Sequence, residues 1–378
     1  MFNKGVTWFF RLIVGLLFIF SGAIKANDIL GFTYRLEDYF SVFGMSFMDP
    51  LATPIAIAIC ILEIFLGVSL LLGTLVTFTV NTLLGMIIFF TFLTFYSAYT
   101  GKVTDCGCFG DAIPLTPWQS FIKDVFLLAF IGYIYANRHL ISPLFSRTNN
   151  ASILWGVTGL SAIFTFYCLY YLPIKDFRPY QVGNDIQEQM ELPEDAKETI
   201  YENVFFYKNT ETGEIHEFVG AGDLPSGDEW EFEDREDKLI QEGDEPPIWN
   251  FSLYNRSGDE VTDDFLNQNG YKLMIVQHDL NSSNRSGQEK INELTRELNS
   301  EFNNGDNIWA LTSSGDETIE QYIFENDVPY DFYTADPVML KTIVRSNPGV
   351  LLLNGNKILG KWPSTNVPDA SRIARLME

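Results

Sequence analysis

Residues 104–111 read Thr-Asp-Cys-Gly-Cys-Phe-Gly-Asp, a short polar segment that separates two long apolar runs and holds Cys106 and Cys108. A Cys-Gly-Cys pair is able to close a small, strained disulfide, and strained bridges are typically oxidising and exchangeable rather than structural. Gly107 and Gly110 permit the tight turns that such a ring needs. The spacing alone leaves two interpretations open, a redox-active pair or two reduced thiols in a loop at the membrane edge.

A metal site is a weaker interpretation of the same loop. Zinc usually takes four protein ligands in a structural site, and the nearest candidates besides the two thiols are Asp105 and Asp111. Copper(I) would require more soft ligands than the loop offers. We therefore expect no metal here and treat Cys106 and Cys108 as the candidate catalytic residues.

The chain of 378 residues divides into two halves of different composition. Residues 1–174 hold eight basic and eight acidic residues, so the remainder carries the whole formal net charge of −24. An acidic soluble half argues against nucleic-acid binding, which depends on Lys and Arg side chains that neutralise phosphates. All four cysteines lie in the apolar half, so cysteine content does not fix the compartment of the acidic half.

Five apolar runs are long enough to cross the hydrocarbon layer, which takes about 20 residues of helix. They cover residues 6–24, 50–72, 75–99, 118–135 and 153–172. The first run resembles a signal peptide in having Lys4 before it and small residues near its end. Because Arg11 interrupts it and further spans follow at once, we expect a retained helix in contact with the lipid bilayer.

The distribution of Lys and Arg favours an N-terminus in the cytoplasm, with Lys4, Arg138 and Arg147 on that side. An odd number of spans then places the cysteine loop and the acidic half on the opposite side. In a Gram-negative cell this is a multi-pass protein of the inner membrane with a periplasmic C-terminal half, where disulfide exchange is normal. Five basic residues weaken this assignment because they also fall outside: Lys25, Arg35, Lys102, Lys123 and Lys175.

Charged residues inside the apolar runs mark the candidate supporting site. A carboxylate such as Glu63 within a membrane helix costs several kcal/mol unless it is paired, protonated or hydrated, and Lys25 is a candidate partner. Lys123 and Asp124 are placed to face the same outer cavity, beside Asp105 and Asp111. A structural ion pair and a reactive site explain these charges about equally well.

Two further features concern how the helices meet. Residues 27–49 mix aromatic and charged side chains, which suits an amphipathic segment at the outer interface, although a plain connecting loop fits equally. Small residues at Gly15, Gly22, Gly67 and Gly85 favour close helix contacts.

Several positions in this half resemble those of the DoxX and MauE-like membrane proteins. They are Arg11, Gly15, Phe18, Ser21, Gly22, Lys25, Glu63, Gly67, residues 70–73, residues 104–111, Trp118, Lys123 and Asp124. More narrowly, the chain resembles the Bacteroidetes branch in which such a bundle is fused to a periplasmic domain. The resemblance implies a four-helix core similar to that of vitamin K epoxide reductase-like thiol oxidases, with Cys106 and Cys108 redox-active in protein maturation.

Electron delivery to a quinone is the cofactor use that the resemblance implies. Those thiol oxidases generally use a Cys-x-x-Cys pair and additional shuttle cysteines, whereas Cys60 and Cys168 here lie within apolar spans. The quinone therefore stays an open expectation. The fifth run is an addition to the four-helix plan and is most simply a tether for the soluble half.

The first part of the acidic half predicts a linker and a small β-rich segment. Residues 173–183 contain two prolines and end in glycine, which predicts an extended linker. Residues 203–219 alternate around a glycine turn and predict a hairpin, and residues 230–239 predict a further strand.

From residue 243 strands alternate with helices. We expect strands near 251–253 and at 273–278, 308–312, 349–353 and 358–362, and helices at 287–302, 317–326, 339–344 and 368–377. This order resembles thioredoxin-like domains, with Pro348 in the place of their cis-proline. The position of their nucleophilic cysteine holds residues 281–285 (Asn-Ser-Ser-Asn-Arg), which contain no thiol. Asn347 and Pro348 are then candidates for binding a partner, and His278 beside them is more simply structural.

The predicted fold class is an α-helical membrane bundle followed by an α/β thioredoxin-like domain with a small β-rich insertion. The expected divisions are a four-helix bundle (1–145), a fifth membrane helix (146–175), a linker with the β-rich segment (176–242) and the thioredoxin-like domain (243–378). Two functions remain open. The first is thiol–disulfide exchange that matures periplasmic proteins, with Cys106 and Cys108 tuned by Lys25, Asp105 and Lys123. The second is a non-catalytic scaffold for a periplasmic or membrane protein partner.

Overall fold

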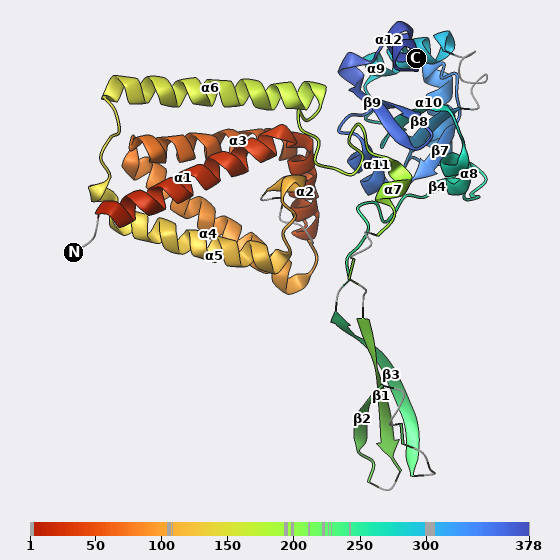
Figure 1. Ribbon diagram of the computed structural model, residues 1–378, viewed down its shortest axis with the longest axis horizontal. Coiled ribbons are helices and arrows are strands. Elements are labelled where there is room, and N and C mark those ends of the chain that lie inside the picture. The colour runs from red at the N-terminus through yellow and green to blue at the C-terminus, as the bar shows by residue number, and fades with distance from the viewer. Residues whose placement is uncertain are drawn as a thin grey trace.

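A computed structural model gives the architecture of the chain. The described residues are 4–103, 107, 109–192, 196–197, 200–210, 212–220, 224–225, 227, 229–241, 243–298 and 307–377. Two structural parts are evident within them, a bundle of long helices at the N-terminal end and a β-containing part at the C-terminal end (Figure 1).

Five helices in the bundle are long and apolar enough to cross a membrane, which confirms the five predicted spans. They are α1 (Lys4–Asn27), α3 (Asp49–Leu72), α4 (Val76–Thr100), α5 (Pro117–Ala136) and α6 (Arg147–Tyr171). Capping interactions fix the N-termini of two of these helices. Thr116 forms a capping box with Gln119 at α5, and the Ser146 side chain accepts a hydrogen bond from the Asn149 N–H at α6.

Small residues bring α1 and α3 together, as predicted for three of the four glycines. A Cβ added to Gly67 would lie 2.7 Å from the carbonyl oxygen of Gly15, and one added to Gly22 would lie 2.8 Å from that of Cys60. These backbones are therefore too close for a larger residue. The prediction was wrong for Gly85, because no described atom lies within 4 Å of its Cβ position.

The connection between α1 and α3 is helical, so residues 27–49 are not a plain connecting loop; their place at the outer interface stays a prediction. The connection forms α2 (Ile29–Val42) and the short 3₁₀ helix η1 (Ser46–Met48). Asp28 caps α2 by accepting a hydrogen bond from the Gly31 N–H. Ile29, Phe32 and Phe40 are buried against the bundle, so α2 covers one end of it (Figure 1).

The C-terminal part contains a six-stranded sheet in the order β4-β7-β6-β5-β8-β9. The strands are β4 (Leu253–Tyr254), β5 (Tyr271–Gln277), β6 (Ile308–Thr312), β7 (Phe332–Ala335), β8 (Gly349–Asn354) and β9 (Lys357–Pro363). Strands β5, β6 and β7 are parallel to one another, while β4, β8 and β9 run antiparallel to their neighbours. The sequence predicted all of these strands except β7.

Helices cover both faces of this sheet. They are α8 (Thr262–Asn267), α9 (Arg285–Glu297), α10 (Asp316–Asn326), α11 (Pro337–Ile343) and α12 (Ala370–Met377). Alternate residues of β5 enter two separate cores, Ile275 with α9 and α10 on one face and Met274 with α11 on the other. The region is therefore an α/β structure of three layers. Helix α9 has its C-cap at Leu298, short of the predicted end at 302, although residues 299–306 lie outside the description.

Part of the expected linker packs on this sheet instead. Tyr180 and Ile186 are buried in the core on the α11 side, and Asp185 forms a β-bridge with Lys357. Ile186 begins the short helix α7 (Ile186–Gln189). Residues 180–190 therefore belong structurally with the six-stranded sheet, because backbone hydrogen bonds from Gly183 and Ile186 reach the β8–β9 hairpin.

A second, three-stranded sheet has the order β2-β1-β3 and projects away from the bundle and from the six-stranded sheet (Figure 1). Its strands are β1 (Ile200–Asn209), β2 (Ile215–Val219) and β3 (Trp230–Gln241). The predicted hairpin and the predicted third strand are both confirmed. We call this sheet, residues 200–241, the arm.

Candidate functional site

The structure locates the cysteine loop through its described neighbours. Cys106, Cys108 and Asp105 lie outside the described residues. Gly107 is buried with a φ of 65°, and a Cβ there would lie 3.2 Å from Cγ of Arg35 on α2. A left-handed φ together with this close approach requires glycine at the position. The backbone between the two cysteines thus lies against α2.

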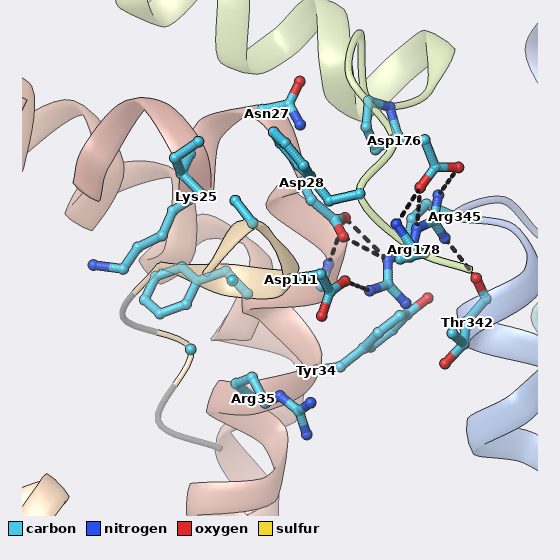
Figure 2. A pocket seen from close by; sticks show the side chains of 18 of the residues that line it. Lys25, Asn27, Asp28, Tyr34, Arg35, Asp111, Asp176, Arg178, Thr342 and Arg345 are labelled. Atoms are coloured by element: carbon cyan, nitrogen blue, oxygen red, sulfur yellow. Dashed lines mark hydrogen bonds and ion pairs between the residues drawn. The ribbon is translucent and has the colours of Figure 1, made fainter. Parts of the chain in front are cut away.

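Gly107 lines a cavity of about 140 Å³ between the bundle and the six-stranded sheet. Figure 2 shows its lining from both parts, with Asp28, Tyr34 and Asp111 from the bundle side and Arg178 and Arg345 from the other. The cavity therefore has acidic, aromatic and basic groups in its wall, and it is formed only when both parts are present.

Arg345 joins the two parts. Its Nε donates to both carboxylate oxygens of Asp28, at 3.0 and 2.9 Å, and its Nη2 lies 3.3 Å from Oδ2 of Asp111. Nη1 donates to the carbonyl of Lys341 at 2.6 Å. Burial alone would raise the pKa of Asp28, but the charges of Arg345 and Arg178 lower it below its usual value. For Asp111 burial prevails, and its pKa is raised although Arg345 opposes the shift.

A second ionic cluster holds the segment that follows α6. Arg178 donates to both carboxylate oxygens of Asp176, at 2.8 and 3.0 Å, and to the carbonyl of Thr342. Lys361 Nζ lies 2.9 Å from Oδ2 of Asp176. Burial opposes ionisation of Asp176, yet these two cations lower its pKa to about 2. The cluster therefore fixes the entry of the chain into the six-stranded sheet.

Buried charges inside the bundle form a separate pocket of about 40 Å³. Lys25 Nζ lies 2.6 Å from Oε1 of Glu63, with both side chains under 5 % exposed, which confirms the predicted pairing. Lys123 pairs with Asp124 at 2.8 Å. All four residues line this pocket, whereas Asp111, which was expected beside Lys123 and Asp124, lines the cavity between the two parts instead. Oε2 of Glu63 is buried, and nothing in the described part of the chain hydrogen-bonds to it.

The cysteine loop also reaches this charged pocket. Phe109 lines it, and the Lys123 Nζ lies 4.9 Å from the centre of the Phe109 ring. Lys25 lines both the charged pocket and the cavity between the two parts. The two described neighbours of Cys108, Gly107 and Phe109, therefore lie in the walls of two cavities that share Lys25.

An apolar pocket of about 400 Å³ adjoins the charged one. Rings from α2 and α4 form most of its wall, and it shares Phe32 and Phe90 with the charged pocket. Thr94 also lines the apolar pocket, and its hydroxyl donates to Asp124 at 3.1 Å. A molecule with an apolar chain and a polar head group would fit this arrangement of an apolar space beside buried charges.

The predicted partner-binding residues lie elsewhere on the six-stranded part. The Asn347–Pro348 peptide bond is cis. The Asn347 side chain donates to the carbonyl of Asp279 at 2.6 Å, and the Asn284 N–H donates to the Asn347 carbonyl at 2.9 Å. Neither Asn347 nor Pro348 lines the cavity between the two parts. His278 nearby contacts the Tyr34 ring of α2 at 6.3 Å between ring centres, and burial lowers its pKa to about 4.

Sequence reasoning missed the residues that join the two parts, namely Asp28, Tyr34, Asp176, Arg178, Lys341 and Arg345. Asp28 and Arg345 are 317 positions apart, and no local pattern connects them. The sequence offered one signal for this junction. The opposite charges of Asp176 and Arg178 lie shortly after the fifth apolar run, in a segment that contains prolines.

Comparison with known proteins supports the assignment of the bundle. Residues 3–137 match the family model described as methylamine utilisation protein MauE. Together with the five apolar helices, this match supports a multi-pass membrane protein.

The chain is also similar to Protein TlpB of Flavobacterium psychrophilum, with 26 % identity over 171 residues. The matched region covers 44 % of this chain and 44 % of that protein, so the chain spans less than half the length of this relative. No solved structure is significantly similar to the chain.

Proposed function

We propose that the protein is a thiol–disulfide oxidoreductase of the bacterial inner membrane that matures periplasmic proteins, with Cys106 and Cys108 as its redox pair. One observation carries the proposal: Gly107 and Phe109, the neighbours of Cys108, lie in the walls of two cavities lined by Lys25. The family match over residues 3–137 includes both cysteines and supports the same conclusion.

The exchange reaction transfers a disulfide from the loop to a client. A client thiolate attacks one sulfur of the Cys106–Cys108 disulfide, and a second client thiolate displaces the loop thiolate from the mixed disulfide. The client is oxidised to a disulfide, while the loop gains two electrons and, at neutral pH, two protons. Lys25 and Lys123 act by favouring the thiolate form through their charge. Glu63, Asp124 and Asp111 have supporting roles as partners of Lys25, Lys123 and Arg345, respectively. Asp105 has a supporting role through its charge.

A lipid-soluble quinone is the acceptor we propose for reoxidation of the loop. A bound quinone would take up the two electrons and two protons of the loop dithiol, and the loop disulfide would form again. The apolar pocket would supply space for an isoprenoid chain. The adjoining charged pocket would supply Lys25 and the Glu63 Oε2, to which no described residue hydrogen-bonds, for a polar head group. The residues that line the two pockets thus fit an amphipathic ligand.

Our assignment places the N-terminus in the cytoplasm and the acidic half in the periplasm. Residues 1–145 are the four-helix core of the bundle, 146–175 the fifth membrane helix, and 243–378 a thioredoxin-like domain without a redox cysteine. Residues 176–242 are the expected linker and the arm, of which residues 180–190 pack with the thioredoxin-like domain. The parallel strands β5 and β6, the helix α9 after β5 and the cis Asn347–Pro348 bond before β8 support the thioredoxin-like assignment.

Trapping of mixed disulfides tests the oxidoreductase function. Cys106→Ser and Cys108→Ser each leave one loop thiol, and we expect one of them to accumulate a covalent complex with a client that reducing agent releases. The matched controls are Cys60→Ser and Cys168→Ser, whose thiols are at most 4 % exposed and should leave client oxidation unchanged. Normal client oxidation in the double Cys106→Ser, Cys108→Ser variant would refute the enzymatic proposal.

A second candidate function, a scaffold in a cell-envelope assembly, is supported by the cysteine content of the acidic half. Residues 169–378 contain no cysteine, so this part has no thiol chemistry of its own. Asn347 and Pro348 would then contact a protein partner. Purification in mild detergent followed by mass spectrometry distinguishes the two candidates, because a scaffold keeps a stoichiometric partner in the double cysteine variant and an oxidoreductase does not depend on one.

A further inference from the structure

The arm has one aromatic face. The strand register pairs Phe205 with Phe218 and Tyr207 with both His216 and Phe232. Alternate residues of a strand point to the same side, so these side chains share a face. Ring contacts join Tyr207 to Phe232 at 5.6 Å between ring centres and extend the cluster to Trp230 through Phe218 and His216.

Among the described residues, no helix or second sheet covers this cluster. The arm forms a sheet separate from the six-stranded one and projects from it (Figure 1). Phe232 is 54 % exposed and Trp230 is partly exposed. Clustered exposed aromatic rings are typical of binding surfaces. The aromatic face is therefore available to another molecule.

The net charge of the arm indicates which kind of molecule binds its aromatic face. Residues 200–241 contain twelve acidic and three basic residues. This excess disfavours a second copy of the arm and disfavours an anionic lipid surface, because both would be repelled. The arm already shows the contact that it favours, since the Arg235 guanidinium carbon lies 5.8 Å from the centre of the Phe205 ring. A cation over an aromatic face is an attractive pairing.

We propose that the aromatic face of the arm is a docking surface for a partner protein that presents a basic segment, whose arginine side chains stack on Tyr207, Trp230 and Phe232. The surrounding carboxylates attract the segment, and the rings give it a preferred position. This proposal is independent of the redox function, because it uses no residue of the bundle or of the cysteine loop.

Binding of a defined peptide to the full chain in detergent tests the proposal. The probe is a fluorescent peptide of alternating arginine and threonine, with glutamate in place of arginine as its control, measured by anisotropy at physiological ionic strength. We expect binding of the arginine peptide only. The double variant Trp230→Leu, Phe232→Leu should weaken it about tenfold, because leucine keeps the apolar strand surface and removes the ring faces.

Two matched variants separate this surface from general acidity. Trp249→Leu removes a ring that is 69 % exposed outside the arm, and it should leave the affinity unchanged. Circular dichroism checks that the leucine variants stay folded, and Phe232→Tyr, which keeps a ring, should bind as the unaltered protein does. Equal affinity in the leucine double variant, an equal loss in Trp249→Leu, or no binding of the arginine peptide would overturn the proposal.

Discussion

The acidic half contains two sheets that bury their apolar residues in different ways. In the six-stranded sheet, β5 is buried on both faces and helices complete the layers. In the arm, the aromatic cluster gathers on one face and its rings stay partly exposed. Since burial of apolar area is the main source of folding free energy, the first sheet stabilises the half and the second contributes little to stability. The arm is therefore the part that is free to serve recognition.

The two sheets also differ in how they relate to the membrane bundle. Arg345 and the Asp176 cluster connect the six-stranded sheet to α2 and to the end of α6. The Thr365 hydroxyl donates to the carbonyl of Tyr170 at the same junction. The arm makes no such connection among the described residues (Figure 1). Substitutions in the two sheets should therefore have separable effects.

The largest effect is expected from Leu352→Ala at the centre of β8. Strand β8 pairs with β5 on one side and β9 on the other, and the Leu352 side chain is fully buried. Truncation of such a side chain lowers the free energy of unfolding by about 4 kcal/mol, because apolar burial is lost and a cavity remains. Hydrogen exchange of the β5 and β8 amides should accelerate about 1,000-fold where exchange requires unfolding of this sheet. The measurement is mass spectrometry of the full chain.

The matched substitution in the arm is Phe232→Ala. Because this ring is more than half exposed, the loss should be about 1 kcal/mol or less and confined to arm amides. Comparable acceleration in both sheets would show that the arm and the six-stranded sheet unfold together, and the two sheets would then not differ in their contribution to stability.

Arg345→Ala is expected to have the next largest effect, at the junction. It leaves Asp28 without its closest cation in a mostly buried site, which costs about 3 kcal/mol. Amides of residues 28–34 and 109–112 should exchange about 100-fold faster, while those of β5 and the arm change little. Hydrogen exchange of the same peptides provides the check.

Arg256→Ala serves as the control for this charge removal. Arg256 pairs with Asp316, Glu320 and Asp331 on the surface of the six-stranded part. Exposed pairs contribute about 0–1 kcal/mol. If Arg256→Ala loosened residues 28–34 as much as Arg345→Ala does, the junction would not depend on the Asp28 contact.

Most of the fold could be predicted because its pattern is local. Long apolar runs predicted the five membrane helices, and buried strands such as 308–312 were located to the residue. Strand β7 (Phe332–Ala335) was missed because four residues after a Pro-Tyr-Asp sequence show little alternation, and its pairing with β6 is the reason it forms a strand. Helix α8 was missed for a similar reason, since a segment of six residues is too short to show the helical periodicity of apolar side chains.

The part of the candidate site that could be predicted from the sequence is the part where a buried charge requires a partner of opposite charge. A carboxylate in a membrane helix needs a partner, so Glu63 indicated Lys25 from the sequence alone. Asp28 and Arg345 are ordinary residues in polar segments, and only the docking of two distant parts makes them buried partners. The same holds for Tyr180, which lies in the expected linker but is buried in the core of the six-stranded sheet.

The smallest effect concerns acid pH and the Asp176 cluster. The pKa of Asp176 is lowered to about 2 in the folded protein, so its ionised form contributes stability above its ordinary pKa of 3.8. That contribution, about 2 kcal/mol, is lost as pH falls from about 4 to 2, when the folded state must also take up the proton. By calorimetry of the full chain, the transition of the six-stranded part should fall by about 6 °C more over this interval in the unaltered protein than in Asp176→Asn. Asp28, whose pKa is also lowered, titrates in the same direction in both proteins and cancels from the difference. Parallel pH profiles for the two proteins would mean that Arg178 and Lys361 do not hold the chain through this carboxylate, and the junction would then depend on Arg345 alone.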